Sequence, residues 1–354
     1  DLGQLNKAEQ LIRKSISLNP NIAEFYINLG TILIDLQRFD EAEFNFKRAI
    51  EINPISLESF LNLGNMYVAQ RKYKNAFVYY QNGYNINPNH PLIKFGMLWV
   101  CSIICDWDVL EQRNSWLDDL GLEGMSVDPL TLMYLDNNIL KDLLRAKNTY
   151  KEKYFSLEDP ITLVPKRKIR VGYFSANFDT HSTMILLIRV LELHNKEEFE
   201  IYIYDFGRYQ EDDYTKRIKS CADRYYKVDD LSNSELVNLA RKSELDIGVD
   251  LMGYTKNNRA LIFSKRIAPI QVTYLDYPGT TANESMDYIL ADQVVVPKED
   301  EKFYTEKVIR MPYSVQPTDD TLEPSNKNFD RSDLGIPQDS FVFCNFSQSQ
   351  QIQR

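Results

Sequence analysis

The sequence predicts a chain of two architectures, a helical solenoid followed by a doubly wound α/β domain built on a parallel sheet. The solenoid is indicated by prolines that recur every 34 residues, at Pro20, Pro54 and Pro88. The α/β domain is indicated by residues 168–291, where short runs of aliphatic and aromatic residues alternate with helical segments. Such alternation is typical of strand–helix–strand units, which form parallel sheets.

Residues 1–93 repeat with the period of tetratricopeptide units, in which two antiparallel helices touch through small residues and a proline ends the second helix. We predict full units at about 23–56 and 57–90, and we interpret residues 1–20 as the second helix of an earlier unit. The residues that keep the period are Ala8, Ala42 and Ala76, together with Leu-Gly pairs at 29–30 and 63–64.

Two asparagines, Asn28 and Asn62, occupy the same position on the first helix of successive units. Because an amide side chain both donates and accepts hydrogen bonds, Asn at this position can bind the backbone of an extended peptide whatever its side chains. The alternative is a pair of solvated polar positions. The peptide-binding interpretation predicts protein or peptide substrates along the concave face of the repeats.

The period is expected to stop near residue 94. Helical segments punctuated by Pro129 and Pro160 follow, and we predict that residues 94–167 form a helical adaptor that buries the open face of the last repeat and docks on the α/β domain. Cys101 and Cys105 lie four apart in an apolar run without a second Cys or His pair nearby. We therefore expect two buried thiols and no metal site.

The α/β domain is predicted to begin with a strand at 168–175, a polar loop at 176–183 that carries His181, and a helix at 184–193. In a doubly wound sheet this loop lies at the carboxyl edge, where ligands bind. An N-cap at Ser232 with Glu235 three residues later marks one helix start. The further strands are expected at 199–206, 224–228, 246–251, 270–275 and 287–291, and the further helices at 214–222, 232–243 and 259–265.

Three loops should meet at the carboxyl edge of this sheet, at residues 179–181, 253–256 and 278–281. Their glycines and hydroxyls allow a ligand to approach the backbone, and free amides suit anionic oxygens. A set of tight turns explains the same residues without a ligand. None of the three has the pattern of a Walker loop or of GxGxxG.

Composition and charge narrow the class of protein. The formal net charge of -10 argues against nucleic acid or an anionic membrane as the main partner. No apolar run reaches ~18 residues and no signal peptide is visible, so we expect a cytoplasmic protein without a membrane span. Both ends look truncated, since Asp1 begins inside a repeat and residues 342–346 read as a new strand near the end of the chain.

Taken in order, the motifs resemble the protein O-linked N-acetylglucosamine transferases, a family whose wider membership includes the Spindly-type protein O-fucosyltransferases. The resemblance covers nearly the whole chain. Its motifs are IRVGYFSANFDTHS, DLMGYTKNNR, APIQVTYLDYPGTT, MDYILADQVVVP and FYTEKVIRMPYSVQPTD, which follow the repeats and a Cys-Asp-Trp adaptor.

The resemblance implies a GT-B-like catalytic region of two Rossmann-like halves, fed with protein substrate by the repeat superhelix. Residues 168–335 would be the amino-terminal half, on the acceptor side, and residues 336–354 the start of the carboxyl-terminal half, which holds most of the sugar-nucleotide site. The implied reaction is an inverting, metal-independent transfer from a nucleotide sugar, UDP-GlcNAc first, to a Ser or Thr hydroxyl. No cofactor is implied. We expect the 354-residue chain alone to be inactive, because transfer needs both halves around the donor.

His181 matches the active-site histidine of the family. An imidazole there could accept a proton, or hydrogen-bond the donor phosphate or the acceptor hydroxyl, and a local hydrogen bond at the helix start is the structural alternative. Asp246 stands where some relatives have histidine, and either faces the acceptor or is bound by backbone amides at a strand start. Tyr254 and Thr255 match the Gly-Tyr-Thr loop that lines the cleft.

Pro278, Gly279 and Thr280 match the Pro-Gly-Thr turn near the donor sugar. The family usually reads Leu-Gly-Tyr-Pro-Gly-Thr, whereas Asp276 replaces the first glycine here. This carboxylate could bond a hydroxyl of a different sugar or point away, which leaves fucose or another hexose as the alternative donor sugar. The alternative from another class is a non-catalytic peptide-binding scaffold. The sequence does not indicate an oligomeric state.

Overall fold

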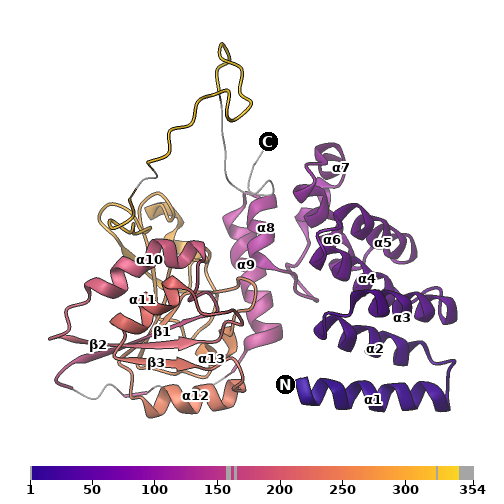
Figure 1. The fold of residues 1–354 in the computed structure, drawn as a ribbon, viewed down its shortest axis with the longest axis horizontal. Coiled ribbons are helices and arrows are strands. Elements are labelled where there is room, and N and C mark those ends of the chain that lie inside the picture. The colour runs from indigo at the N-terminus through magenta and orange to yellow at the C-terminus, as the bar shows by residue number, and fades with distance from the viewer. Residues whose placement is uncertain (1, 157–160, 163–165, 324–325, 343–354) are drawn as a thin grey trace. The chain divides into compact units, whose positions relative to one another are not determined.

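The computed structural model describes residues 2–156, 161–162, 166–323 and 326–342. The chain divides into two compact units after Asn138 (Figure 1). The first unit is helical, and its helices pair in sequence order as the repeat pattern predicts. They are α1 (Leu2–Leu18), α2 (Ala23–Asp35), α3 (Phe39–Ile52), α4 (Leu57–Ala69), α5 (Tyr73–Ile86), α6 (Pro91–Ile103), α7 (Trp107–Gln112), the 3-10 helix η1 (Asn114–Asp118) and α8 (Pro129–Leu135).

Small residues let the paired helices approach closely, as predicted from the Leu-Gly pairs. A Cβ added at Gly30 would lie 2.6 Å from the ring of Phe46, and one added at Gly64 would lie 2.2 Å from the ring of Tyr80. Large aromatic rings therefore fill the space that the missing side chains leave, and this packing forms the core of the repeats.

The helical period continues past the point where we expected it to stop. Helices α2, α4 and α6 begin 34 residues apart, and so do α3, α5 and α7. The first helix of each repeat is followed, two residues after its last residue, by a residue with positive φ: Gln37 (φ 58), Arg71 (φ 57) and Cys105 (φ 56). The prediction of a break near residue 94 is therefore wrong for the backbone. The repeat signature fades there because Met97 and Leu98 replace the Leu-Gly pair.

The turn at each of these residues is a Schellman motif. In the second full repeat, the N–H of Arg71 donates to the carbonyl of Val68 at 2.9 Å, and the N–H of Lys72 donates to the carbonyl of Tyr67 at 2.9 Å. Cys101 is buried as predicted, but Cys105 is exposed. That prediction is corrected because Cys105 occupies the left-handed turn position rather than a helix face.

Residues 94–138 do not form one adaptor with the residues that follow. A small core of Leu98, Leu117, Leu120, Val127 and Leu132 packs beside the last repeat in the first unit. The second unit begins with α9 (Ile139–Thr149), which ends in a π-helical turn, η2 (Tyr150–Tyr154).

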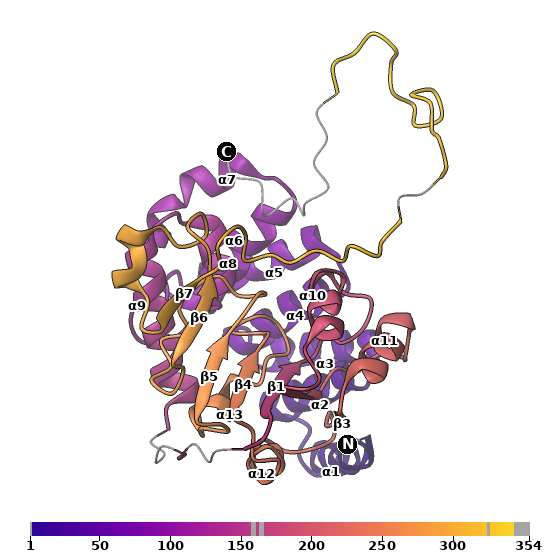
Figure 2. The same cartoon turned by 90° about the vertical axis from the view of Figure 1, so that its left-hand side faces the viewer.

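A seven-stranded parallel sheet forms the second unit, with strand order β3-β2-β1-β4-β5-β6-β7. Figure 2 shows β1, β4, β5, β6 and β7 side by side. The doubly wound sheet predicted from the sequence is confirmed, and β7 is an additional strand that we did not predict. The strands are β1 (Ile169–Ser175), β2 (Phe199–Asp205), β3 (Arg224–Lys227), β4 (Ile247–Asp250), β5 (Ile270–Thr273), β6 (Tyr288–Ala291) and β7 (Lys307–Arg310).

Helices cover both faces of the sheet because alternate strand residues point to opposite sides. Val171 and Tyr173 of β1 pack in the core beneath α10 (Ser182–Leu193) and α11 (Asp213–Cys221), whereas Phe174 packs with α12 (Asn233–Lys242) and α13 (Ala260–Ser264). The predicted capping box of Ser232 and Glu235 opens α12. The 3-10 helix η3 (Lys298–Phe303) precedes β7.

Among the helices that the structure describes, none is both long and apolar enough to cross a membrane. The strand predicted at 342–346 lies outside the described residues except for Val342.

Candidate active site at the carboxyl edge of the sheet

A polar cavity of about 580 Å³ opens at the carboxyl edge of the sheet. It lies where the loops after β1, β2, β3 and β4 meet, which is the edge at which doubly wound folds bind ligands. Its lining residues are Ala176, Asn177, Asp179, His181, Phe206, Gly207, Arg208, Tyr209, Asp229, Leu231, Asn257 and Arg259.

His181 is exposed at the mouth of this cavity and is the N-cap of α10. Its Nδ1 lies 3.3 Å from the backbone N of Thr183 and 2.8 Å from Thr183 Oγ1. The local hydrogen bond expected as the structural alternative is therefore present. It uses one ring nitrogen only, so the other remains available to a ligand in the cavity.

The loop after β2 forms a second wall and is organised by Asp205, which is fully buried at the end of that strand. Its carboxylate accepts hydrogen bonds from the N–H of Gly207 (2.8 Å), the hydroxyl of Tyr209 (2.6 Å) and the ammonium of Lys227 (3.0 Å). Burial and the bond to Asp205 raise the pKa of Tyr209 far above its ordinary value, so its hydroxyl remains a donor. The sequence analysis did not identify this group.

Two arginines line the cavity in different ways. Arg259 donates to the side chain of Asn233 and to the carbonyls of Val228 and Leu231, so its guanidinium is committed to the fold. Burial lowers the pKa of Arg259 below its ordinary value. Arg208 is exposed and forms no ion pair within the part of the chain that the structure describes. It is therefore the lining cation available to an anionic group.

The first residues of the loop after β4 are held in place by hydrogen bonds and close packing. Asp250 accepts hydrogen bonds from the N–H groups of Met252 and Gly253, and burial raises its pKa to about 6. Gly253 has φ +54, and a Cβ there would lie 2.4 Å from Cβ of Tyr277. Close packing and the positive φ together require glycine.

Tyr254 and Thr255 were predicted to line the cleft, but neither is among the residues that line this cavity. Tyr254 is buried, stacks on Tyr154 with ring centroids 5.4 Å apart, and donates its hydroxyl to the carbonyl of Thr281 at 2.5 Å. The Oγ1 of Thr255 is buried without a partner among the described residues. In this structure Tyr254 therefore joins the loops after β4 and β5.

Asp276 follows Leu275, whose φ of +84 is a strained conformation for a leucine. Its carboxylate accepts hydrogen bonds from the hydroxyl of Thr183 at 2.5 Å and from the side-chain amide of Asn177 at 3.2 Å. Burial raises the pKa of Asp276, while these bonds and the nearby His181 lower it. The carboxylate therefore points to the loop that carries His181.

The turn at Pro278, Gly279 and Thr280 is held by Glu306, a buried residue just before β7. The hydroxyl of Thr280 donates to Glu306 at 2.5 Å, and Thr281 donates through its N–H at 2.7 Å and its hydroxyl at 2.5 Å. Gly279 is buried and Pro278 is exposed. In this structure the Thr280 hydroxyl is therefore engaged in the fold.

Asp246 does not join the other candidates. It precedes β4, and its carboxylate accepts hydrogen bonds from the ammonium of Lys166 and the N–H of Arg170, both at 2.8 Å. Because Arg170 lies at the start of β1, this cluster is at the amino edge of the parallel sheet, opposite the cavity. Of the two interpretations of Asp246, the structure supports the strand-start aspartate and corrects the acceptor-facing one.

Asn28 and Asn62 lie on α2 and α4 of the first unit, at equivalent positions. Asn28 is exposed and Asn62 is half-buried. Neither side chain has a hydrogen-bond partner within the described ranges. Their amides are thus available to a peptide, and that role stays a prediction.

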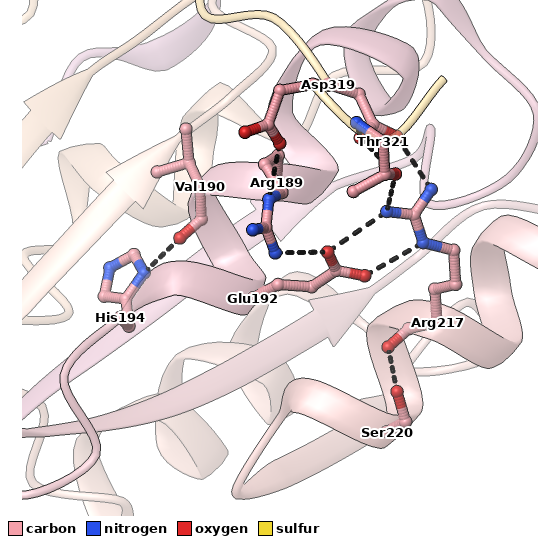
Figure 3. Close-up of polar contacts among 9 residues, drawn as sticks. Arg189, Val190, Glu192, His194, Arg217, Ser220, Asp319 and Thr321 are labelled. Atoms are coloured by element: carbon pink, nitrogen blue, oxygen red, sulfur yellow. Dashed lines mark hydrogen bonds and ion pairs between the residues drawn. The ribbon is translucent and has the colours of Figure 1, made fainter. Parts of the chain in front are cut away.

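Helix α10, which His181 caps, is anchored by ion pairs of Arg189 and Glu192 near its C-terminal end (Figure 3). Arg217 of α11 donates to Glu192 of α10 at 2.9 Å and to Asp319 at 2.8 Å. Arg189 of α10 donates to Asp320 at 2.7 Å. These contacts fasten the segment after β7 to the two helices that cover this face of the sheet.

Two segments of the chain match tetratricopeptide repeat profiles, at residues 23–55 and 57–90. Repeats of this type followed by a parallel-sheet domain with a polar cavity at its carboxyl edge define the class as a repeat-bearing Rossmann-like protein. The profile of glycosyl transferase family 41 matches residues 144–323, about half of the chain, and the chain belongs to this family.

The chain is 33% identical over 188 residues to the Arabidopsis thaliana protein named "Probable UDP-N-acetylglucosamine–peptide N-acetylglucosaminyltransferase SEC", covering 51% of this chain and 19% of that protein. It is 28% identical over 197 residues to the SPINDLY protein of Oryza sativa, covering 52% and 21%. It thus spans about a fifth of these relatives. A solved O-GlcNAc transferase mutant of Thermobaculum terrenum matches the fold with TM-score 0.56 and 22% identity, over 89% of this chain and 55% of that one.

Proposed function

We propose that this chain is part of a protein O-glycosyltransferase that transfers N-acetylglucosamine from UDP-GlcNAc to Ser or Thr hydroxyls of protein substrates. The observation that carries the proposal is the position of His181. It lies in the cavity at the carboxyl edge of the sheet, within the segment that matches glycosyl transferase family 41. The names of the SEC and SPINDLY relatives supply the donor sugar.

In the proposed reaction the acceptor oxygen forms a bond to the anomeric carbon while the bond from that carbon to the phosphate oxygen breaks. The nucleoside diphosphate leaves with the electron pair, and the acceptor hydroxyl loses its proton. Inversion follows from attack on the face opposite the leaving group. The free ring nitrogen of His181 could accept a hydrogen bond or the proton from the acceptor, and Arg208 could stabilise an anionic oxygen.

The repeats would present the protein substrate. Asn28 and Asn62 carry amides without a partner among the described residues, at one position of successive repeats, and such amides can bind a peptide backbone through donor and acceptor pairs. This supports protein acceptors rather than small molecules. It also supports the second candidate, a peptide-binding scaffold without transfer activity.

The test is the intact mass of an acceptor protein after incubation with the full-length protein and a panel of sugar nucleotides, including UDP-GlcNAc and GDP-fucose. We expect a gain of one or more N-acetylglucosamine residues with UDP-GlcNAc alone, and a loss of that gain in His181→Ala. His194→Gln is the matched control, because His194 is a histidine of the same unit that does not line the cavity.

A gain with GDP-fucose alone would replace the sugar and keep the enzyme. No gain with any donor would remove the transferase proposal and favour the scaffold. In that case, reduced peptide binding by an Asn28→Ala, Asn62→Ala double variant would test the repeats directly.

A further inference from the structure

Three side chains form a continuous hydrogen-bonded chain beside the cavity: His181 in the loop after β1, Thr183 in the first turn of α10, and Asp276 in the loop after β5. Asp276 Oδ1 lies 2.5 Å from Thr183 Oγ1, and Thr183 Oγ1 lies 2.8 Å from His181 Nδ1. Thr183 is 1% exposed, so its hydroxyl exchanges these partners for water only at a cost. We propose that Asp276 is a positioning residue whose carboxylate, acting through the Thr183 hydroxyl, holds the His181 imidazole in the tautomer that carries its proton on Nδ1.

The direction of the chain follows from counting hydrogens. A threonine hydroxyl has one hydrogen and can accept through its lone pairs. An ionised carboxylate only accepts, so the Thr183 hydrogen goes to Asp276 at 2.5 Å. Lone pairs of Oγ1 then face Nδ1 at 2.8 Å, and this contact is favourable only if Nδ1 carries a hydrogen.

One contact opposes this arrangement. The backbone N–H of Thr183 also points to Nδ1, at 3.3 Å, and it would favour an unprotonated Nδ1. Both contacts could be satisfied at once only if Asp276 were protonated. It would then donate to Thr183 Oγ1, and the Thr183 hydroxyl would donate to Nδ1. The shorter contacts therefore decide in favour of Nδ1–H for as long as Asp276 is ionised.

The surroundings of Asp276 stabilise its charge and fix its direction. Asn177 donates its side-chain amide to the second carboxylate oxygen at 3.2 Å. The positive φ of Leu275 turns the chain at the residue immediately before Asp276. Burial acts against ionisation of Asp276. The hydrogen bonds from Thr183 and Asn177 favour the charged form, although burial still leaves the pKa of Asp276 above its ordinary value.

The consequence for chemistry is that Nε2 is unprotonated on an exposed ring that lines the cavity. An unprotonated imidazole nitrogen can accept a hydrogen bond or a proton from a hydroxyl, whereas the opposite tautomer could only donate one there. This last step rests on the proposed function, since it requires an acceptor hydroxyl in the cavity. The tautomer itself does not.

The test is nitrogen and carbon NMR of the histidine rings in the 354-residue chain, at a pH where the rings are neutral. The sequence has three histidines, so the spectrum is simple. His194 is an internal reference, because its Nδ1 lies 2.6 Å from the carbonyl of Val190 and must carry the hydrogen, while its Nε2 lies 3.0 Å from the Tyr173 hydroxyl.

We expect His181 to show the same Nδ1–H pattern as His194 in the unaltered chain. Thr183→Val removes the hydroxyl, leaves the backbone N–H pointing at Nδ1, and should shift His181 to the Nε2–H tautomer. Thr183→Ser keeps the hydroxyl and should keep Nδ1–H. In Asp276→Asn, the Asn177 amide should still donate to the side-chain oxygen at position 276, so the new NH2 group faces Thr183. This NH2 group donates to Thr183 Oγ1, and the Thr183 hydroxyl then donates to Nδ1 of His181. We therefore expect the Nε2–H tautomer in this variant.

An Nε2–H pattern for His181 in the unaltered chain would overturn the inference, and so would an unchanged tautomer in both Thr183→Val and Asp276→Asn. Unchanged His90 and His194 signals show that a variant is folded, and Asp276→Asn serves if Thr183→Val is not. If the histidine tautomers are as expected but the full-length protein transfers no sugar, the proposed function is wrong and the inference about the tautomer stands. Sugar transfer by the full-length protein, with an unchanged tautomer in both Thr183→Val and Asp276→Asn, would remove the inference alone.

Discussion

Arg217 and Asp319 form a 2.8 Å ion pair between α11 and the segment that follows β7, and the Asp319 side chain is fully buried (Figure 3). Arg217 also pairs with Glu192 of α10 at 2.9 Å. A single guanidinium therefore links two helices and a segment about 100 residues away in sequence. Loss of one partner leaves a charged group in a site built for a pair, which costs more than the pair itself contributes.

Asp319→Asn should lower the free energy of unfolding by about 2 kcal/mol, because Arg217 is partly exposed and keeps Glu192 as a partner. Urea denaturation monitored by circular dichroism measures this. Asp320→Asn is the matched control, since Asp320 pairs with Arg189 but is 71% exposed, and it should cost less than about 0.5 kcal/mol. Equal effects of the two variants would contradict the assignment.

The same carboxylate predicts an acid-sensitive contribution to stability. The bond from Arg217 lowers the pKa of Asp319 to about 2, whereas an unfolded aspartate titrates near ~3.9. A group with a depressed folded pKa stabilises above its unfolded pKa and loses that contribution as the pH falls through the folded value. We expect the stability difference between the unaltered chain and Asp319→Asn to shrink from pH 4 toward pH 2, following the titration interval. A constant difference would contradict this.

Glu306 should matter to the fold of the Pro-Gly-Thr turn. Its carboxylate accepts three hydrogen bonds from Thr280 and Thr281 in a buried site. Glu306→Gln replaces an acceptor oxygen with an amide that donates, so at least one of these donors loses its partner, at a cost of about 1–3 kcal/mol. Differential scanning calorimetry measures the loss. Glu301→Gln is the control, because Glu301 binds Arg310 at a side chain that is 42% exposed.

A second pH dependence of stability is expected from His194, which is neutral in the folded state, whereas Asp319 is charged there. It is half-buried and neutral, donating from Nδ1 to Val190 and accepting from Tyr173 at Nε2, and burial lowers its pKa below the ordinary 6.5. The unfolded state then binds the proton more readily, so stability should fall as the pH drops through about 6.5 toward the folded pKa. His194→Gln should flatten the stability profile between pH 7 and pH 5 in this interval. An unaltered slope would exclude His194 as the source.

The sequence predicted elements whose signals are local. The 34-residue period located the repeats, and alternating aliphatic and aromatic runs located β1 to β6, because side-chain periodicity reflects a buried face directly. Strand β7 was missed because it is a short edge strand in which no side chain is fully buried, so its sequence has no run of apolar residues. The third helix pair, α6 and α7, was missed because Met97 and Leu98 replace the Leu-Gly pair, although the helices keep the 34-residue spacing.

The candidate site was predicted less completely, for two reasons. The first is that the rule that ligands bind after the strand ends was applied to some loops only. It located His181, and it would also have located Asn177, Arg208 and Asn257 at the same edge. Asp246 could have been excluded, because it precedes its strand and so lies at the amino edge. The second reason is distance in sequence. The partner of Asp276 is 93 residues away, and no local pattern predicts such a pair.

The turns between repeat helices offer a final prediction, because each puts a residue with a side chain where glycine is preferred. Arg71 has φ 57, is exposed and forms no ion pair among the described residues. A left-handed conformation costs an L-residue about 1–2 kcal/mol, and glycine avoids this cost while losing some backbone entropy. Arg71→Gly should therefore raise the free energy of unfolding of the repeats by about 0.5–1 kcal/mol. Arg71→Ala keeps the Cβ and should give no gain in the same denaturant titration, so equal effects of both variants would show that the gain comes from losing the charge and not from the turn.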